Sequence, residues 1–391
     1  MTWQTRSLTA LLVIVGLTSS ACSDDANQIA SPETPVDSLS VSTAVRWNQR
    51  AVALVVARQP TSNGQAAVSR VLTYLSVAQY RAATAAQASA NSAKPPSVGA
   101  AIGGASAAVL NFFFPLDVAA TEAQLNGDLA VPPWPSESKT DLAAGESLGR
   151  STGAAVVTQA MADNYLTVAP PATPVGPDKW MSAPSVGVVR SLHGTRPFFL
   201  ASVGQLRAPA PPAVGSAAFV TGLTEVRRIA DTRTPAQAAI ANFWNTSSGT
   251  FTAGALNLIA DSVIRAHRAS EAEAVRILAF ANAAAFDAQI ACWDSKFTYW
   301  FIRPSQMDPG IVMSIALPNH PSYPSGHSCM SASFLGVVAD AFPQDRERLD
   351  AIVEEAGMSR VYGGIHYRFD IEAGRDIGRA AAALALKGSL K

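Results

Sequence analysis

The amino-acid sequence contains three short stretches that decide its fold: KFTYWFIRP at residues 296–304, PSGH at 324–327 and SRVYGGIHYRFD at 359–370. In the first stretch, Lys296 and Arg303 stand seven residues apart. On an α-helix this spacing is two turns, so we expect both side chains to point from one face. Pro304 follows at once. Because proline lacks an N–H and clashes with the preceding turn, we expect it to end that helix.

The second and third stretches supply small hydrogen-bond donors and two histidines. Gly326 has no side chain, so an anion can approach its backbone N–H, and Ser325 adds a hydroxyl. His366 and Asp370 stand four residues apart. At the start of a helix, this spacing lets a carboxylate hold the second nitrogen of the ring.

Taken together, these residue types predict a site for a tetrahedral or trigonal-bipyramidal oxyanion. The cations Lys296, Arg303 and Arg360 match its equatorial oxygens. One histidine can face the central atom, while the other exchanges protons with an apical oxygen. Each stretch alone has an ordinary explanation, as a solvated helix face, a turn or a capping contact. Their conjunction in this order favours the oxyanion site.

The three stretches resemble the signature of the superfamily that joins type-2 phosphatidic acid phosphatases, bacterial class A acid phosphatases and vanadium-dependent haloperoxidases. That signature is Lys-x6-Arg-Pro, Pro-Ser-Gly-His and Ser-Arg-x5-His-x3-Asp, and this chain matches every fixed position. The resemblance implies that His366 is the axial vanadium ligand of a peroxidase or the phosphate nucleophile of a phosphatase. It implies that His327 is the acid–base partner and that Asp370 orients His366. The implied oxyanion-binding residues are Lys296, Arg303, Ser325, Gly326 and Arg360, and Lys296 would also polarise a bound peroxide.

Neighbouring residues favour the peroxidase branch of this superfamily. Residues 288–304 (AQIACWDSKFTYWFIRP) and 225–243 (EVRRIADTRTPAQAAIANF) are similar to bacterial haloperoxidase-like proteins. Trp293 stands one turn before Lys296, and His320 stands seven residues before His327, where bromoperoxidases carry a second histidine. We expect Trp293 and His320 to line a halide or substrate pocket. The alternatives are core packing for the tryptophan and an ordinary loop histidine.

Three functions remain open at this stage. The favoured one is a vanadate-dependent haloperoxidase that oxidises halide with hydrogen peroxide and uses vanadate as cofactor. The alternative is a periplasmic acid phosphatase, which would cleave a phosphomonoester or a lipid phosphate through a phosphohistidine and need no cofactor. A non-catalytic oxyanion-binding lipoprotein is least favoured, because binding alone would not need both His327 and His366.

Helical periodicity dominates the rest of the chain. Apolar residues return at helical steps in residues 44–58, 65–88, 98–113, 140–164, 217–231, 235–244, 253–268 and 271–302. Pro115 and Pro343 mark expected helix edges. Residues 165–215 hold nine of the 25 prolines, which predicts a long irregular excursion. With no run of period two, we expect an all-α helical bundle of the vanadium haloperoxidase and acid phosphatase type.

The N-terminus has the features of a bacterial export signal. Within residues 1–22, Arg6 precedes an apolar run, and small residues precede Cys22. The ending SSAC resembles a lipoprotein cleavage box, in which Cys22 becomes lipidated. Ordinary cleavage near Ala21 is the alternative. Residues 23–42 are polar and predict a flexible tether, which leaves residues 43–391 as a single helical domain with its active-site motifs in 296–370.

We therefore expect an exported protein that faces the periplasm or the cell exterior. Its membrane contact would be limited to the lipid anchor, since no later segment looks long and apolar enough to span a bilayer. The 29 basic and 29 acidic residues balance, so no basic excess is available for nucleic acid, and we expect only small-molecule substrates. Two buried free thiols are favoured for Cys292 and Cys329 over a disulfide. The sequence leaves the oligomeric state open.

Overall fold

The computed structural model describes residues 42–59, 64–130, 140–182, 188–246 and 249–390. These residues fall within one compact unit, Leu39–Lys391. The predicted signal peptide, the lipidation site Cys22 and the tether up to residue 41 lie outside the described residues. Export and lipidation therefore stay predictions.

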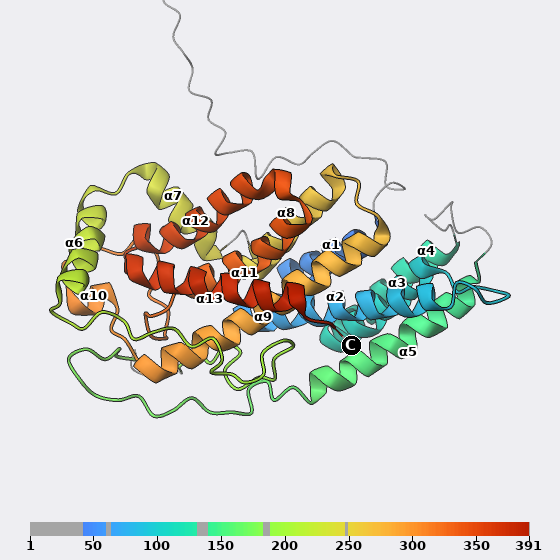
Figure 1. The fold of residues 1–391 in the computed structure, drawn as a ribbon, viewed down its shortest axis with the longest axis horizontal. Helices are drawn as coiled ribbons and strands as arrows, with labels where there is room; N and C mark the ends of the chain where they lie inside the picture. Colours follow the sequence, from blue (N-terminus) through green and yellow to red (C-terminus); the bar gives the residue numbers. More distant parts are fainter. Residues whose placement is uncertain (1–41, 60–63, 131–139, 183–187, 247–248, 391) are drawn as a thin grey trace, which may run out of the picture. The chain divides into compact units, whose positions relative to one another are not determined.

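Among the described residues the chain forms thirteen α-helices and no β-strand, which confirms the all-α prediction (Figure 1). The helices are α1 Thr43–Arg58, α2 Gly64–Ala88, α3 Val98–Phe113, α4 Val118–Ala130, α5 Leu142–Met161, α6 Ala217–Thr232, α7 Pro235–Thr246, α8 Phe251–Ala266, α9 Glu271–Tyr299, α10 Pro304–Met307, α11 Gly326–Ala341, α12 Arg346–Tyr362 and α13 Arg368–Lys387. Short 3₁₀ turns begin at Pro115 and Pro343, where helix edges were expected.

The central helix α9 is buried along almost its whole length and packs against α2, α11 and α13. A capping box starts it, because Ser270 and Glu273 each accept the other's backbone N–H. Contrary to the expectation from sequence, α9 is long and apolar enough to span a membrane. However, 94% of its most apolar window is buried within the protein. A helix that is apolar on all sides suits this position in a core.

Helices α11 and α13 approach each other closely because glycines lie at their contact. A Cβ on Gly374 would lie 2.6 Å from the carbonyl oxygen of Ser325, and one on Gly378 would lie equally close to that of Cys329. Only glycine allows two backbones this close. The Ser325 N–H also donates to the Asp370 carbonyl over 2.9 Å. The second and third stretches therefore meet at one end of the two helices.

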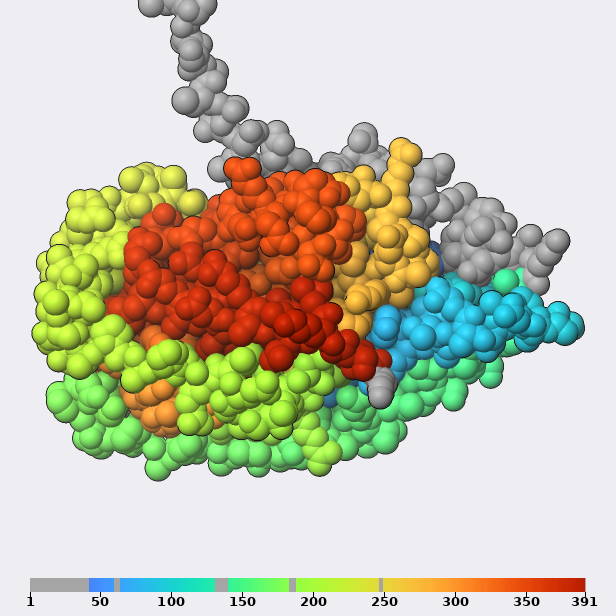
Figure 2. Space-filling model, in the orientation of Figure 1, coloured from blue at the N-terminus to red at the C-terminus, as the bar shows by residue number. Residues whose placement is uncertain are grey.

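The proline-rich segment is irregular throughout its described parts, as predicted. It is nevertheless anchored on α9, where the buried carboxylate of Asp287 accepts the backbone N–H groups of Phe198, Phe199 and Leu200 at 2.6–3.0 Å. Further along α9, the Ser295 hydroxyl accepts the Ala208 N–H over 3.0 Å. In Figure 2 the yellow-green part of this segment runs along the lower side of α13. The excursion therefore covers the helix that carries the first stretch.

Two sequence expectations about the first stretch are wrong. Helix α9 ends at Tyr299 rather than at residue 302, because Trp300 adopts a left-handed conformation (φ 50°) and its N–H bonds back to the Lys296 carbonyl. Trp180 holds this turn by donating its N–H to the Trp300 carbonyl over 2.7 Å. Pro304 does not end the helix but begins α10, since proline suits a first helical position. Helix α4 and the helices after residue 302 (α10 to α13) lie outside the helical ranges that periodicity predicted.

Candidate active site

Lys296 lies in the last turn of α9 and is fully buried. Its ammonium donates to the carbonyls of Pro321 and Ser322, each at 2.8 Å, and to that of Pro324. These contacts fasten the loop before the second stretch onto α9. Burial lowers the pKa of Lys296 to about 8. The side chain therefore remains a cation at neutral pH.

Arg303 lies in the extended segment that follows α9. Its guanidinium donates to the carbonyls of Ile365 (2.7 Å) and His320 (2.9 and 3.1 Å). It also lies 3.0 Å from His366 Nε2 and 3.0 Å from His320 Nδ1. Because a guanidinium can only donate, His366 Nε2 accepts from it, whereas His320 Nδ1 also lies 3.2 Å from the Pro321 carbonyl. Lys296 and Arg303 thus meet at one site through the turn at Trp300, not through two turns of one helix.

Arg360 completes a buried cluster of cations. It lies on α12, where its Nε donates to Ser359 Oγ over 3.0 Å and its Nη2 donates to the Ala241 carbonyl of α7 over 2.8 Å. Burial lowers the pKa of Arg360 to about 9 and that of Arg303 to about 10, so both stay charged at neutral pH. Both guanidiniums and the Lys296 ammonium are at most 2% exposed. Buried cations require a counter-charge, and an oxyanion supplies one.

The N-terminus of α11 offers neutral donors to the same site. Ser325 is buried at the N-cap, and its hydroxyl has no hydrogen-bond partner among the described residues. A Cβ on Gly326 would lie 3.1 Å from the Trp293 ring, so a larger residue would have to displace that indole. His327 follows in the first turn. Desolvation lowers its pKa to about 3, so its imidazole is neutral at ordinary pH.

His366 and Asp370 form a hydrogen-bonded pair at the start of α13. His366 Nδ1 lies 2.8 Å from Asp370 Oδ2, which also accepts the Ser322 hydroxyl (2.6 Å) and the Tyr367 N–H (3.1 Å). Burial raises the pKa of Asp370 to about 6 and places that of His366 well below its usual range. At neutral pH the carboxylate therefore accepts from a neutral ring. The lone pair of His366 lies on Nε2, on the side of Arg303.

The segment that holds these residues is also similar to a known family. Residues 274–391, which contain all three stretches, match the PAP2 superfamily. We refer to the site that the three stretches form as the PAP2 site. No curated protein sequence matches the chain.

Solved structures extend the likeness beyond the PAP2 segment. A bacterial vanadium-dependent iodoperoxidase superposes with a TM-score of 0.73 at 23% identity, over 91% of this chain and 98% of that one. The apo form of a bacterial vanadium-dependent chloroperoxidase gives 0.62 at 14% identity, over 82% and 91%. Its holo form gives 0.62 at 13% identity, over 94% and 96%. The chain therefore has the fold of the bacterial vanadium-dependent haloperoxidases.

Trp293 and His320 lie together at one side of the PAP2 site. Their ring centroids are 5.1 Å apart, and Lys296 Nζ lies 5.5 Å from the centroid of the indole. Trp293 is 5% exposed and donates its Nε1–H to the Val189 carbonyl over 3.1 Å. Burial lowers the pKa of His320 well below its usual range, and Lys296 and Arg303 lower it further. The two residues thus form a wall of aromatic rings next to the cations.

The PAP2 site also contains groups that the sequence did not point to. Ser322 joins Lys296 to Asp370, since its carbonyl accepts from the ammonium and its hydroxyl donates to the carboxylate. Thr252 and the Trp244 carbonyl contact His327. These contacts link residues that are distant in the chain, so no local sequence pattern predicts them. Cys292 and Cys329 are buried and free, which confirms the prediction of two free thiols.

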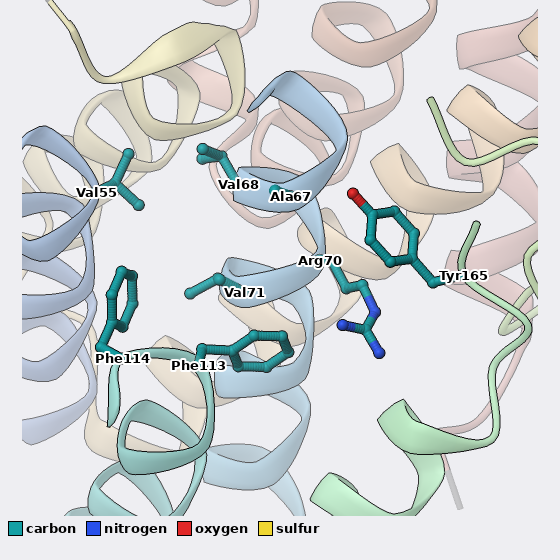
Figure 3. A pocket seen from close by; sticks show the side chains of 8 residues that line it. All are labelled: Val55, Ala67, Val68, Arg70, Val71, Phe113, Phe114 and Tyr165. Atoms are coloured by element: carbon teal, nitrogen blue, oxygen red, sulfur yellow. The ribbon is translucent and has the colours of Figure 1, made fainter. Parts of the chain in front are cut away.

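A pocket lies away from the PAP2 site. Figure 3 shows it between α1, α2 and α3, with Val55, Val71 and Phe114 among the apolar side chains that line it. Its charged residue, Arg70, is paired with Asp163 over 2.8 Å. None of the predicted site residues lines this pocket. This pocket is therefore separate from the three stretches.

The residues of the cluster fit vanadate. A vanadate ion needs cations and neutral donors around its oxygens and one neutral imidazole nitrogen for the metal. The three buried cations, the Ser325 hydroxyl and His366 Nε2 supply these groups. Among the described residues, no three His, Cys, Asp or Glu side chains form a group that could hold a metal cation. The donor set thus suits a metal in the form of an oxyanion.

Proposed function

We propose that the chain is a vanadate-dependent haloperoxidase, which oxidises a halide with hydrogen peroxide. The observation that carries this proposal is the set of three buried cations around two neutral histidines, walled on one side by Trp293 and His320. Vanadate bound there would supply an electrophilic centre that accepts hydrogen peroxide and activates it towards halide. The fold of the bacterial vanadium-dependent haloperoxidases supports the same proposal.

The proposed roles of the side chains follow from their contacts. Lys296, Arg303 and Arg360 would neutralise the equatorial oxygens, and Ser325 Oγ and the Gly326 N–H would donate to them. His366 Nε2 would be the protein ligand of vanadium, because Asp370 holds the proton on Nδ1. Lys296 would polarise the bound peroxide. His327 would take a proton from the incoming hydrogen peroxide and return one to the leaving water.

Phosphatase activity is the second candidate, since the PAP2 match covers the same residues. His366 Nε2 would attack the phosphorus of a phosphomonoester, and the bond to the alcohol oxygen would break. His327 would first take a proton from the phosphomonoester monoanion and then pass it to the leaving alcohol. Water would then cleave the phosphohistidine, with His327 as the base, and release inorganic phosphate.

One assay separates the two candidates. The chain from Ser23 onward is incubated with and without orthovanadate, and then given hydrogen peroxide with iodide or bromide, or a generic phosphomonoester. Halide oxidation that requires vanadate supports the haloperoxidase. Phosphate release that vanadate inhibits supports the phosphatase. His366→Ala should abolish either activity, and turnover retained by this variant refutes the assignment of the site.

We further propose that the protein is exported and anchored by a lipid on Cys22, since residues 1–22 have the pattern of an export signal that ends in a cysteine. Growth of the expressing bacterium with a labelled fatty acid tests this. The lipoprotein should carry the label and sediment with membranes, whereas Cys22→Ala should carry none. A chain that is released in soluble form with its cleavage near Ala21 contradicts the anchor.

A further inference from the structure

The ring of His327 is held by two groups that lie outside the three stretches. Its Nε2 lies 2.9 Å from the carbonyl oxygen of Trp244, near the end of α7. It also lies 3.1 Å from the hydroxyl oxygen of Thr252, in the first turn of α8. Among the described residues, both hydrogen-bond contacts of this ring are made by Nε2. The two ring nitrogens therefore have different surroundings.

These contacts determine which nitrogen carries the proton of the neutral ring. A carbonyl oxygen can only accept, so a nitrogen at 2.9 Å from it must donate. The Nε2 atom therefore bears the hydrogen, and the Thr252 hydroxyl is placed to accept from the same N–H. The lone pair of the neutral ring is consequently on Nδ1.

We propose that Thr252 is a positioning residue, which together with the Trp244 carbonyl holds His327 so that Nδ1 exchanges the proton with the bound oxyanion. This inference rests on the proposed function of the site. It assigns opposite nitrogens to the two histidines, because Asp370 takes the Nδ1–H of His366 and leaves Nε2 for the central atom. In either proposed reaction, Nδ1 of His327 takes up one proton and gives one back, while Nε2–H remains bound to the Trp244 carbonyl.

The two holding groups are themselves fixed in place. The Trp244 indole donates its Nε1–H to Glu355 over 2.9 Å, and Glu355 lies on α12, the helix that carries Arg360. The Thr252 N–H donates to the Gln65 side chain over 3.0 Å. Thr252 is 2% exposed and Trp244 is 1% exposed, so water has little access to either hydrogen bond with His327. The ring of His327 therefore has one preferred orientation relative to Arg360.

The test uses Thr252→Val, which removes the hydroxyl but keeps the shape, and Thr252→Ser, which restores the hydroxyl. We expect Thr252→Val to lower turnover about tenfold or more, within the roughly 10²–10⁴-fold that acid–base catalysis contributes. Orthovanadate affinity and the KM for hydrogen peroxide should change less than about twofold. Thr252→Ser should recover most of the turnover. Thr158→Val, which removes an exposed hydroxyl on α5, is the matched control.

Nitrogen NMR of histidine-labelled protein provides a second readout that needs no activity. The signal pair that disappears in His327→Gln identifies this residue among the five histidines. It should show a protonated Nε2 and an unprotonated Nδ1, and Thr252→Val should broaden or shift it. A protonated Nδ1, or unchanged turnover and signals in Thr252→Val, overturns the proposal. Loss of orthovanadate binding in wild type would instead count against the proposed function.

Discussion

Ser322 donates its hydroxyl to Asp370 over 2.6 Å, while the carbonyl of the same serine accepts from the ammonium of Lys296. One residue thus connects the buried cation Lys296 to the carboxylate that orients His366. The connection is buried, since Ser322 and Asp370 are both fully enclosed. A shift of the loop before the second stretch would therefore move both ends of the site.

Removal of this hydroxyl tests the connection. Ser322→Ala deletes a hydrogen bond to a charged group, which is worth about 1.5–3 kcal/mol. We expect turnover to fall by roughly tenfold to a hundredfold, because Asp370 then holds His366 less firmly. Steady-state kinetics and orthovanadate titration measure the effect. Ser331→Ala removes a buried hydroxyl that has no partner and should change little; equal effects of the two changes contradict the role of Ser322.

Replacement of Lys296 by alanine should weaken oxyanion binding. The lost charge-assisted contact is worth about 1.5–3 kcal/mol, so the dissociation constant of orthovanadate should rise roughly tenfold to a hundredfold. Isothermal titration calorimetry measures it directly. Lys387→Ala, at the exposed end of α13, is the control for loss of one positive charge. Unchanged affinity in Lys296→Ala counts against its role.

Gly326→Ala should disturb the site without unfolding the protein. The new Cβ would lie 3.1 Å from the Trp293 ring, which would have to give way. Overpacking of this kind costs about 1–3 kcal/mol. We expect reduced orthovanadate affinity and a changed tryptophan fluorescence, with the circular dichroism of the helices preserved. The double variant with Trp293→Phe should recover part of the affinity, and a failure to do so argues against the indole as the obstacle.

The anchor of the proline-rich excursion should make stability depend on pH. Burial raises the pKa of Asp287 to about 6. Because the folded pKa lies above the unfolded one, this group's contribution is fully present below pH of about 4 and is lost as pH rises through about 6. The difference amounts to roughly 3 kcal/mol. Urea unfolding at several pH values should show this loss in wild type but not in Asp287→Asn, and parallel profiles would refute it.

The sequence was sufficient for the residue types of the site but not for the geometry that joins them. Lys296 and Arg303 were expected on one helix face, yet they meet because Trp300 turns left-handed, a conformation that tryptophan rarely adopts. Neither the helical periodicity nor the positions of the prolines predict this turn. The pairing of His366 with Asp370 was predictable because a four-residue spacing at a helix start is local.

The sequence could not identify the groups that position His327 and Asp370, because their contacts are not local. Thr252 and His327 are 75 residues apart, and Ser322 and Asp370 are 48 apart. Such contacts depend on how whole helices pack, and a single threonine or serine has no distinctive sequence context. The close contact of α11 with α13 at Gly374 could likewise not be predicted before the positions of both helices were known.

The cover that α2 provides for α9 has a consequence for fragments of this protein. Gln289 donates to Ser69 over 2.7 Å, and the Asn282 carbonyl accepts from Thr73 over 3.3 Å, so α2 belongs to the same buried layer as the PAP2 segment. A polypeptide restricted to residues 274–391 would expose this face of α9 to water. Such a fragment should partition into detergent micelles or aggregate. We therefore do not expect residues 274–391 to fold as an autonomous module, because α2, some two hundred residues earlier, covers one face of α9.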